Sequence, residues 1–306
     1  MPIALAPAKI NLYLCVLGRR EDGFHAVDSL IAPLGFGDIL ELEAHAGAND
    51  QLDCDDADLN TPDNLILRAL AAFRERFPEA PFFKVGLQKK IPVGAGLGGG
   101  SSNAATVMRL ANCFCGNPLN RQQLQLLAAG IGSDCAVFLK PCATFVSGRG
   151  EILSEASEGL MAALDDRSLV VFKPPFSIAT PWAYRCLSQR KGFSQASEVA
   201  ALRKGWQSLS AADRVGSTLL HNDFELAMCE RHLSLRVLLA GLRKHLQSPV
   251  LMSGSGSAFF VLQPDDADKK TLLKMLHSAY GDRFFWVETM VKGNNTCSNN
   301  TPSYYQ

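Results

Sequence analysis

One glycine-rich stretch, residues 92–105, constrains this 306-residue chain more than any other part of its sequence. It reads Pro-Val-Gly-Ala-Gly-Leu-Gly-Gly-Gly-Ser-Ser-Asn-Ala-Ala, with five glycines in seven positions. Glycine has no Cβ, so its backbone adopts positive φ and approaches a ligand closely. Apolar residues then recur at helical spacing, which predicts a helix over 101–115 with Ser101 or Ser102 as its N-cap. A glycine turn that enters a helix N-terminus collects free N–H groups, so the stretch predicts a phosphate-binding loop.

Three other glycine loops that bind nucleotides do not fit this stretch. A Walker A loop ends in Gly-Lys-Ser/Thr, whereas Gly100 is followed directly by serine. Gly94, Gly96 and Gly99 satisfy the dinucleotide pattern, but no Asp or Glu occurs from residue 80 to 133 to hold a ribose. The strand and loop motifs of protein kinases are absent from the sequence. The remaining alternative is a glycine-rich surface turn without a ligand, although flexible linkers rarely run straight into an amphipathic helix.

The string 92–105 resembles the phosphate loop of the GHMP small-molecule kinases. Residues 7–12 (Pro-Ala-Lys-Ile-Asn-Leu) resemble the first motif of that superfamily, and 253–257 (Ser-Gly-Ser-Gly-Ser) resemble its third. Within the superfamily the match narrows to members that act on a cytidine diphosphate alcohol of the non-mevalonate isoprenoid pathway. The narrowing motifs are Arg-Glu-Asp-Gly-Phe-His at 20–25, Asp-Asn-Leu-Ile at 63–66, Gly-Ser-Asp at 132–134 and His-Asn-Asp-Phe-Glu at 221–225.

The predicted elements mix strands and helices along the whole chain, which is typical of an α+β protein. We expect strands at 10–17, 27–34, 38–43, 82–88, 143–147, 151–154, 169–172, 250–252, 258–262 and 284–290. We expect helices at 65–77, 101–115, 120–130 and 267–280, with further helical segments before residue 245.

The resemblance implies a two-domain GHMP-kinase fold. Its N-terminal domain would be ribosomal protein S5 domain 2-like and its C-terminal domain ferredoxin-like. The polar or small residues 155–167 make the expected junction, which gives an N-terminal domain over 1–160 and a C-terminal domain over 161–292. The polar tail 293–306 is expected to be disordered.

Composition excludes several classes of partner. Lysine plus arginine equals aspartate plus glutamate, 30 against 30, so no basic excess predicts binding to nucleic acid or to an anionic membrane. The N-terminus has neither the pattern of a signal peptide nor that of a membrane anchor. Nine cysteines without a Cys-x-x-Cys pair indicate reduced thiols in a cytoplasmic protein, and the six histidines form no zinc-type cluster. We therefore expect no metal site in the protein. We expect the protein to be a monomer or a homodimer.

Transfer of a γ-phosphoryl group to an alcohol requires a phosphate cradle, a cation and a group that handles the hydroxyl proton. Lys9 is the candidate cation, because it stands in an apolar run where no surface charge is expected. Asp134 is the candidate base. The alternatives are that Lys9 is a solvated strand end and that Asp134 caps a helix. The resemblance places Lys9 and Asp134 at the catalytic lysine and aspartate of the superfamily.

The resemblance also implies a cytidine pocket. Phe24 and His25 match a Tyr-His pair whose ring stacks on cytosine and whose histidine reads the polar edge of the base. Phe24 keeps the stacking face of that tyrosine but loses its hydroxyl group. Tyr184 matches the second stacking aromatic residue, and Asn11 is expected to contact the substrate beside Lys9. Aromatic residues of this kind are more often part of a core than of a ligand clamp.

ATP is the phosphoryl donor that the resemblance implies, and Mg²⁺ is expected to arrive with it. The residues expected to contact ATP are Pro92, Val93, Gly94, Ala95, Gly96, Leu97, Gly98, Gly99, Gly100, Ser101, Ser102, Asn64 and Lys89. Asn64 could instead be an N-cap, and Lys89 a solvated charge.

The third motif is expected to border the substrate. Its residues Gly254, Ser255 and Gly256 could equally form only a tight turn between strands. The chain departs from the family pattern at Ala95, which replaces a glycine, and after Asp134, where Cys135 and an alanine replace Val-Pro.

The expected activity is the ATP-dependent phosphorylation of the 2-hydroxyl of the cytidine diphosphate alcohol. A homoserine- or mevalonate-type kinase of the same superfamily is the alternative enzyme. A nucleotide-binding relative without catalytic activity is the alternative from another class.

Overall fold

The computed structural model describes residues 2–140, 142–190 and 192–292. Its larger sheet has seven strands, in the order β3-β4-β2-β1-β8, and β5 pairs with both β2 and β6. These strands are β1 (Ile3–Arg19), β2 (His25–His45), β3 (Gln51–Cys54), β4 (Phe82–Gln88), β5 (Thr144–Gly148), β6 (Ile152–Glu155) and β8 (His221–Asn222). The smaller sheet has the order β11-β7-β10-β9 and is antiparallel throughout. Its strands are β7 (Ser168–Lys173), β9 (Val250–Met252), β10 (Phe259–Leu262) and β11 (Phe285–Met290).

Two long strands, β1 and β2, form an antiparallel pair at the centre of the larger sheet. The separate strands predicted at 27–34 and 38–43 are wrong, because β2 runs without a break through Gly35-Phe-Gly37. Gly37 serves close packing instead of a turn, since an added Cβ would overlap the backbone oxygen of Ala6 on β1. The register of β1 shifts between Pro7 and Lys9 and again after Asn11. Such β-bulges change the direction of side chains, here those of Lys9 and Asn11.

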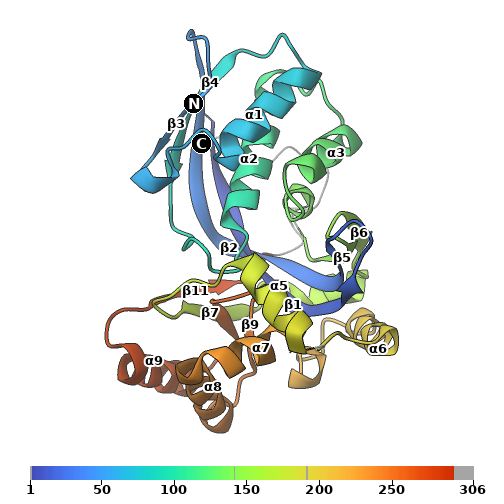
Figure 1. Cartoon of the computed structure of the whole chain (residues 1–306), viewed down its shortest axis with the longest axis vertical. Coiled ribbons are helices and arrows are strands. Elements are labelled where there is room, and N and C mark those ends of the chain that lie inside the picture. The colour runs from blue at the N-terminus through green and yellow to red at the C-terminus, as the bar shows by residue number, and fades with distance from the viewer. Residues whose placement is uncertain (1, 141, 191, 293–306) are drawn as a thin grey trace.

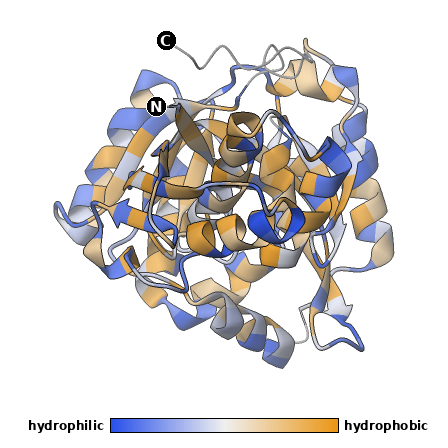
Figure 2. Cartoon of the chain, turned by 90° about the horizontal axis from the view of Figure 1, so that it is seen from above, coloured by the Kyte–Doolittle hydropathy of each residue, from blue (hydrophilic) through white to orange (hydrophobic). Residues whose placement is uncertain are grey.

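Helices cover the two sheets separately. In Figure 1, α1 (Leu65–Arg76), α2 (Gly99–Phe114) and α3 (Arg121–Ile131) lie together in the upper half beside the larger sheet. The smaller sheet packs in the lower half against α5 (Thr180–Arg190), α7 (Asp223–Arg231), α8 (Leu233–His245) and α9 (Asp266–Tyr280). Hydrophobic residues concentrate in the interior and hydrophilic ones at the margin (Figure 2). A third apolar cluster joins residues of β1, β7 and β10 with α6 (Ala196–Gln207), so the two sheets share a core.

The start of α2 differs from the prediction. Its N-cap is Gly98, at φ +72°, rather than Ser101 or Ser102, and no side chain caps it. The predicted apolar face is buried at Ala104 and Met108, whereas Phe114 is exposed. Because the N-cap is a glycine, which has no side chain, the first N–H groups of the helix are left without a capping group.

Two short strands and one short α-helix of the described residues were not predicted: β3, β8 and α4 (Glu158–Leu164). The last of these lies inside the expected junction 155–167, where Ser157 caps it by accepting a hydrogen bond from the Leu160 N–H group. The division of the chain at residue 160 stays a prediction, and the tail 293–306 lies outside the described residues. Within the described ranges, no helix has the length and apolar character needed to cross a membrane.

Candidate active site

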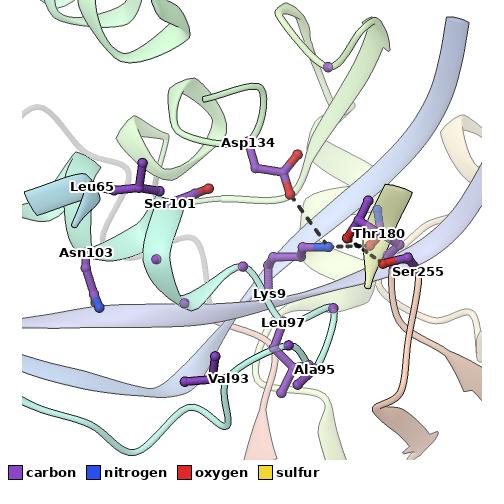
Figure 3. A pocket seen from close by; sticks show the side chains of 18 of the residues that line it. Lys9, Leu65, Val93, Ala95, Leu97, Ser101, Asn103, Asp134, Thr180 and Ser255 are labelled. Carbon is purple, nitrogen blue, oxygen red and sulfur yellow. Dashed lines mark hydrogen bonds and ion pairs between the residues drawn. The ribbon is translucent and has the colours of Figure 1, made fainter. Parts of the chain in front are cut away.

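A cavity of about 560 Å³ opens where the glycine loop, β1 and the start of α5 meet. Most of the predicted site residues line it, including Lys9, Asn11, Asp134 and Tyr184. Of the predicted residues, Ser102, Phe24, His25 and Gly256 are not among those that line it. Figure 3 shows Lys9 and Asp134 pointing toward each other inside the cavity, with Thr180 and Ser255 beside them. The structure therefore brings residues from distant parts of the sequence to one place.

Backbone conformation keeps the glycine loop in shape. Gly94, Gly96 and Gly98 all have positive φ, between 64° and 77°. Ala95 is buried without positive φ, so the replacement of a glycine there is tolerated. The loop is also tied to β1, because the Lys9 N–H group donates to the Leu97 carbonyl at 3.0 Å.

Lys9 is buried in the middle of β1, with 4% of its surface exposed, so its interpretation as a solvated strand end is wrong. Its ammonium donates to Asn11 Oδ1 at 2.6 Å, and the Asn11 amide donates to Ser29 Oγ at 2.8 Å. This chain of polar side chains fixes the position of the Lys9 ammonium. The remaining N–H groups of the ammonium are available to the cavity side.

Asp134 faces Lys9 across the cavity, with Nζ and Oδ2 3.9 Å apart. The carboxylate side chain is 41% exposed, whereas that of Lys9 is 5% exposed. Burial lowers the pKa of Lys9 below its usual 10.5, and the Asp134 charge opposes this effect in part. Asp134 does not cap the following 3₁₀-helix (Ala136–Leu139), whose N-cap is Cys135. The aspartate therefore has no structural partner of that kind and faces the cavity.

The third motif forms both a turn and part of the cavity wall. It joins β9 to β10, and Gly254 and Ser255 line the cavity. Thr180 Oγ1 lies 2.9 Å from Ser255 Oγ, and Ser253 Oγ donates to the Gly96 carbonyl at 3.1 Å. The third motif and the glycine loop therefore hold each other in place.

The motif at 221–225 supports these loops from behind. The Asn222 amide donates to the carbonyls of Met252 and Gly254 at 2.7 and 2.9 Å. Glu225 accepts the Met252 N–H group at 3.0 Å. From the sequence alone this motif is only a family marker, and the structure shows that it fixes the third motif.

Asn64 and Lys89 both line the cavity, but each side chain has a structural partner. Asn64 is the N-cap of α1, as the alternative held, and accepts from the Ile66 N–H group at 3.0 Å. Lys89 is not a solvated charge, because its ammonium is paired with the fully buried Asp38. Asp38 also accepts the N–H groups of Lys90 and Ile91 at 2.7 and 2.8 Å. This carboxylate therefore anchors the entry to the glycine loop, a role that the sequence analysis missed.

Asn103 is a second residue that the sequence analysis missed. It lies in the second turn of α2, lines the cavity and is only 3% exposed. Its Oδ1 atom is buried without a hydrogen-bond partner, as is the hydroxyl of the neighbouring Ser102. Because buried polar groups are normally hydrogen-bonded, the Asn103 atom in the cavity wall fits a site that takes a polar ligand. The signal in the sequence is the run of polar residues at 101–103, just before the apolar positions of the helix.

The aromatic residues expected to hold the cytosine have other ring partners in the structure, and the expected sandwich stays a prediction. Tyr184 stacks on the His25 ring at 4.6 Å, and Phe224 meets Tyr184 edge-on. Burial raises the pKa of Tyr184 to about 12, and burial lowers the pKa of His25. Phe24 is 52% exposed, with the Arg149 guanidinium 5.0 Å from the centre of its ring. Tyr184 therefore lines the cavity itself, whereas Phe24 contacts Arg149, a residue of the cavity wall.

One group of side chains has the composition of a metal site. Cys15, His221 and Asp223 bring their ligand atoms within 4.8 Å of one another. The Asp223 carboxylate accepts from Val16 N, Ser194 Oγ and His221 Nε2, at distances between 2.6 and 2.9 Å. Burial raises the pKa of the Cys15 thiol to about 12, which favours the protonated form. Hydrogen bonds account for this group, and the expectation of no metal site stays a prediction.

Comparisons with known proteins indicate the family of the chain. The family model described as the GHMP kinases N terminal domain matches residues 64–140. A protein of Protochlamydia amoebophila (strain UWE25) named 4-diphosphocytidyl-2-C-methyl-D-erythritol kinase is 34% identical over 258 residues, 84% of this chain and 83% of that protein. The chain belongs to the 4-diphosphocytidyl-2-C-methyl-D-erythritol kinase family.

Solved structures support the same assignment. A crystal structure of 4-(cytidine 5'-diphospho)-2C-methyl-D-erythritol kinase superposes with a TM-score of 0.71 at 30% identity, over 94% of this chain and 99% of that one. Homoserine kinase from Cytophaga hutchinsonii gives a TM-score of 0.69 at 15% identity, over 92% of this chain and 95% of that one, which shows the fold alone. The predicted α+β GHMP-kinase fold is thereby confirmed.

Proposed function

We propose that this chain phosphorylates the 2-hydroxyl of 4-diphosphocytidyl-2-C-methyl-D-erythritol with ATP as donor, a step of the non-mevalonate isoprenoid pathway. The observation that carries the proposal is the pair of Lys9 and Asp134, 3.9 Å apart beside the glycine loop in one cavity. Relatives that bear this enzyme name, at 34% identity over most of the chain, favour this substrate over homoserine or mevalonate. Intact Lys9, Asp134 and glycine loop also speak against a relative without catalytic activity.

On the side of α2, the cavity suits a nucleoside triphosphate. The first N–H groups of that helix have no capping side chain, and the helix dipole favours an anion there. The unpaired Asn103 Oδ1 offers an acceptor to a polar ligand such as the adenosine part of ATP. ATP supplies the γ-phosphoryl group, and Mg²⁺ is expected to be bound chiefly by the phosphate oxygens.

The chain's own residues then have separate tasks in the transfer. The substrate hydroxyl oxygen forms a bond to the γ-phosphorus, the bond from that phosphorus to the bridging oxygen breaks, and ADP leaves. Asp134 accepts the hydroxyl proton or orients the hydroxyl for attack. The Lys9 ammonium stabilises negative charge on the transferring group, and Asn11 holds that ammonium in place. Thr180 and Ser255 border the same point from the opposite wall.

Recognition of the substrate is assigned to its cytidine end. Tyr184, His25 and Phe24 provide aromatic faces near the cavity, and Ser188 lies 3.2 Å from His25 Nε2 and orients that ring. Binding energy from the distant base would position the erythritol hydroxyl for attack.

Phe24→Ala is expected to lower kcat/KM for the cytidylyl substrate by a factor that corresponds to about 1–3 kcal/mol, the value of one base-stacking contact. Affinity for ATP should stay nearly constant. Phe114→Ala provides the control, because this phenylalanine is similarly exposed but lies at the far end of α2. Steady-state kinetics with both variants check the result, and an equal loss in the control would remove the stacking role from Phe24.

Gly98→Ala is expected to weaken the binding of an ATP analogue by about tenfold or more, since 1.4 kcal/mol corresponds to a factor of ten. Gly98 has φ +72°, and an added Cβ would lie 2.7 Å from the Phe138 ring and 3.1 Å from Lys9 Cγ. Gly130→Ala in α3 is the control, because nothing lies within 4 Å of a Cβ there. Calorimetric titration measures both. Unchanged affinity in a folded Gly98→Ala variant would argue for a turn without a ligand.

The proposal is tested by the position of the new phosphate. Phosphorus and carbon NMR of the product should show the added phosphate on the tertiary carbon that bears the 2-hydroxyl. A phosphate on any other hydroxyl of the erythritol would contradict the proposed geometry.

A further inference from the structure

One buried lysine has no role in the proposed reaction. Lys173 is the last residue of β7 and is only 9% exposed. Its ammonium donates to the carbonyls of Pro174 and Phe176, at 3.2 and 2.8 Å. No carboxylate of the described residues forms an ion pair with it, and burial lowers its pKa. A buried cation that binds only backbone carbonyls is costly, so the segment it holds needs an explanation.

The segment from Pro174 to Ser177 follows directly and connects β7 to the start of α5. It begins with two prolines, which have no N–H groups. The segment therefore offers fewer backbone donors to the carbonyls around it. A lysine ammonium carries three donors and replaces them. The Phe176 carbonyl also accepts from Ser257 of the third motif, and the Phe176 ring stacks on His232 at 4.9 Å. The segment is therefore fixed from several sides.

The other side of this segment contacts the glycine loop. Ser177 Oγ donates to the Val93 carbonyl at 3.2 Å. A Cβ added to Gly94 would lie 3.0 Å from Ser177 Cβ, so the two chain segments are packed closely. Gly94 has positive φ and lines the cavity. A displacement of Ser177 would therefore change the entry of the phosphate loop.

We infer that Lys173 is a positioning residue for the glycine loop, acting through the segment from Pro174 to Ser177. The inference rests on the proposed function only in taking the ligand of that loop to be the phosphates of ATP. Lys173 does not line the cavity and contacts no reacting group. Its effect should appear in the affinity for ATP and leave the alcohol site unchanged.

The test compares Lys173→Met with Ser177→Ala by calorimetric titration of a non-hydrolysable ATP analogue. Lys173→Met is expected to weaken binding about tenfold, and Ser177→Ala about threefold, in line with hydrogen bonds from charged and neutral donors. The double variant should lose less than the product of the two factors, because both substitutions act through one segment. Lys84→Met on β4 is the control, since that lysine is half exposed on the other sheet.

A merely structural lysine would change the melting temperature and leave the ATP affinity as it is. Wild-type affinity in both folded variants would overturn the inference. If Lys173→Met does not fold, an unchanged affinity in Ser177→Ala overturns it equally. Failure of the unaltered protein to bind the analogue would instead contradict the proposed function. The KM for the alcohol should stay within about twofold, and an equal rise in both KM values would also count against the inference.

Discussion

Asp134→Asn is expected to lower kcat by about 10²–10⁴-fold, the usual contribution of a positioned general base. Asparagine keeps the shape of the side chain but does not accept a proton at neutral pH. The carboxylate faces Lys9 at 3.9 Å and caps no helix, so the substitution removes little structural support. Affinities for ATP and for the alcohol should therefore stay near the wild-type values. Single-turnover kinetics together with calorimetric titration of both ligands measure the two effects.

The control for this substitution is Asp282→Asn, whose side chain is 96% exposed. It removes one negative charge at the surface and should leave kcat unchanged. A kcat for Asp134→Asn near that of the wild type would remove Asp134 from the catalytic machinery. A loss of ligand affinity that accounts for the whole change would make it a binding residue.

Lys9→Met is expected to lower kcat by about 10²–10³-fold, the effect of removing one donor that stabilises charge in the transition state. The free energy of unfolding of this variant should rise or hardly change. Burial lowers the pKa of Lys9 in the folded protein, so below the unfolded value of 10.5 the buried charge reduces stability. Removal of that charge offsets the loss of the hydrogen bond to Asn11.

The pH profile separates these two effects. The ammonium of Lys9 acts only below its pKa, so kcat should fall as the pH rises through a value under 10.5. Lys9→Met should lack this alkaline limb. Thermal melting of the variant completes the test. A variant that loses activity only because it unfolds would contradict the catalytic role of Lys9.

The sequence predicts much of the architecture because hydrophobic periodicity and turn residues are local signals. β4 and β9 have the predicted bounds residue for residue. The failures come from tertiary contacts. Gly35-Phe-Gly37 is typical of a link between two strands. The strand is nevertheless continuous there, and close packing against β1 explains Gly37. β8 has two residues and depends on β1 for pairing, so it carries no pattern of its own.

The site shows the same division. Sequence motifs predict Lys9 and Asp134 as site residues, and the structure brings them to one cavity. Asp38 was missed, because its three donors come from residues 89–91, about fifty positions later in the chain. A burial site for a carboxylate is a property of the folded chain and leaves no local sequence signal. The stack of Tyr184 on the His25 ring likewise joins residues far apart in the sequence and has no local signal.

The most direct test of the account is ADP release by the purified protein with ATP, Mg²⁺ and a panel of three alcohols. The account predicts turnover with 4-diphosphocytidyl-2-C-methyl-D-erythritol and none above background with homoserine or mevalonate. Methylerythritol phosphate, which lacks the cytidylyl group, should be a very poor substrate when it is added as a fourth comparison. Faster turnover of homoserine or mevalonate would leave the fold assignment in place and contradict the proposed substrate.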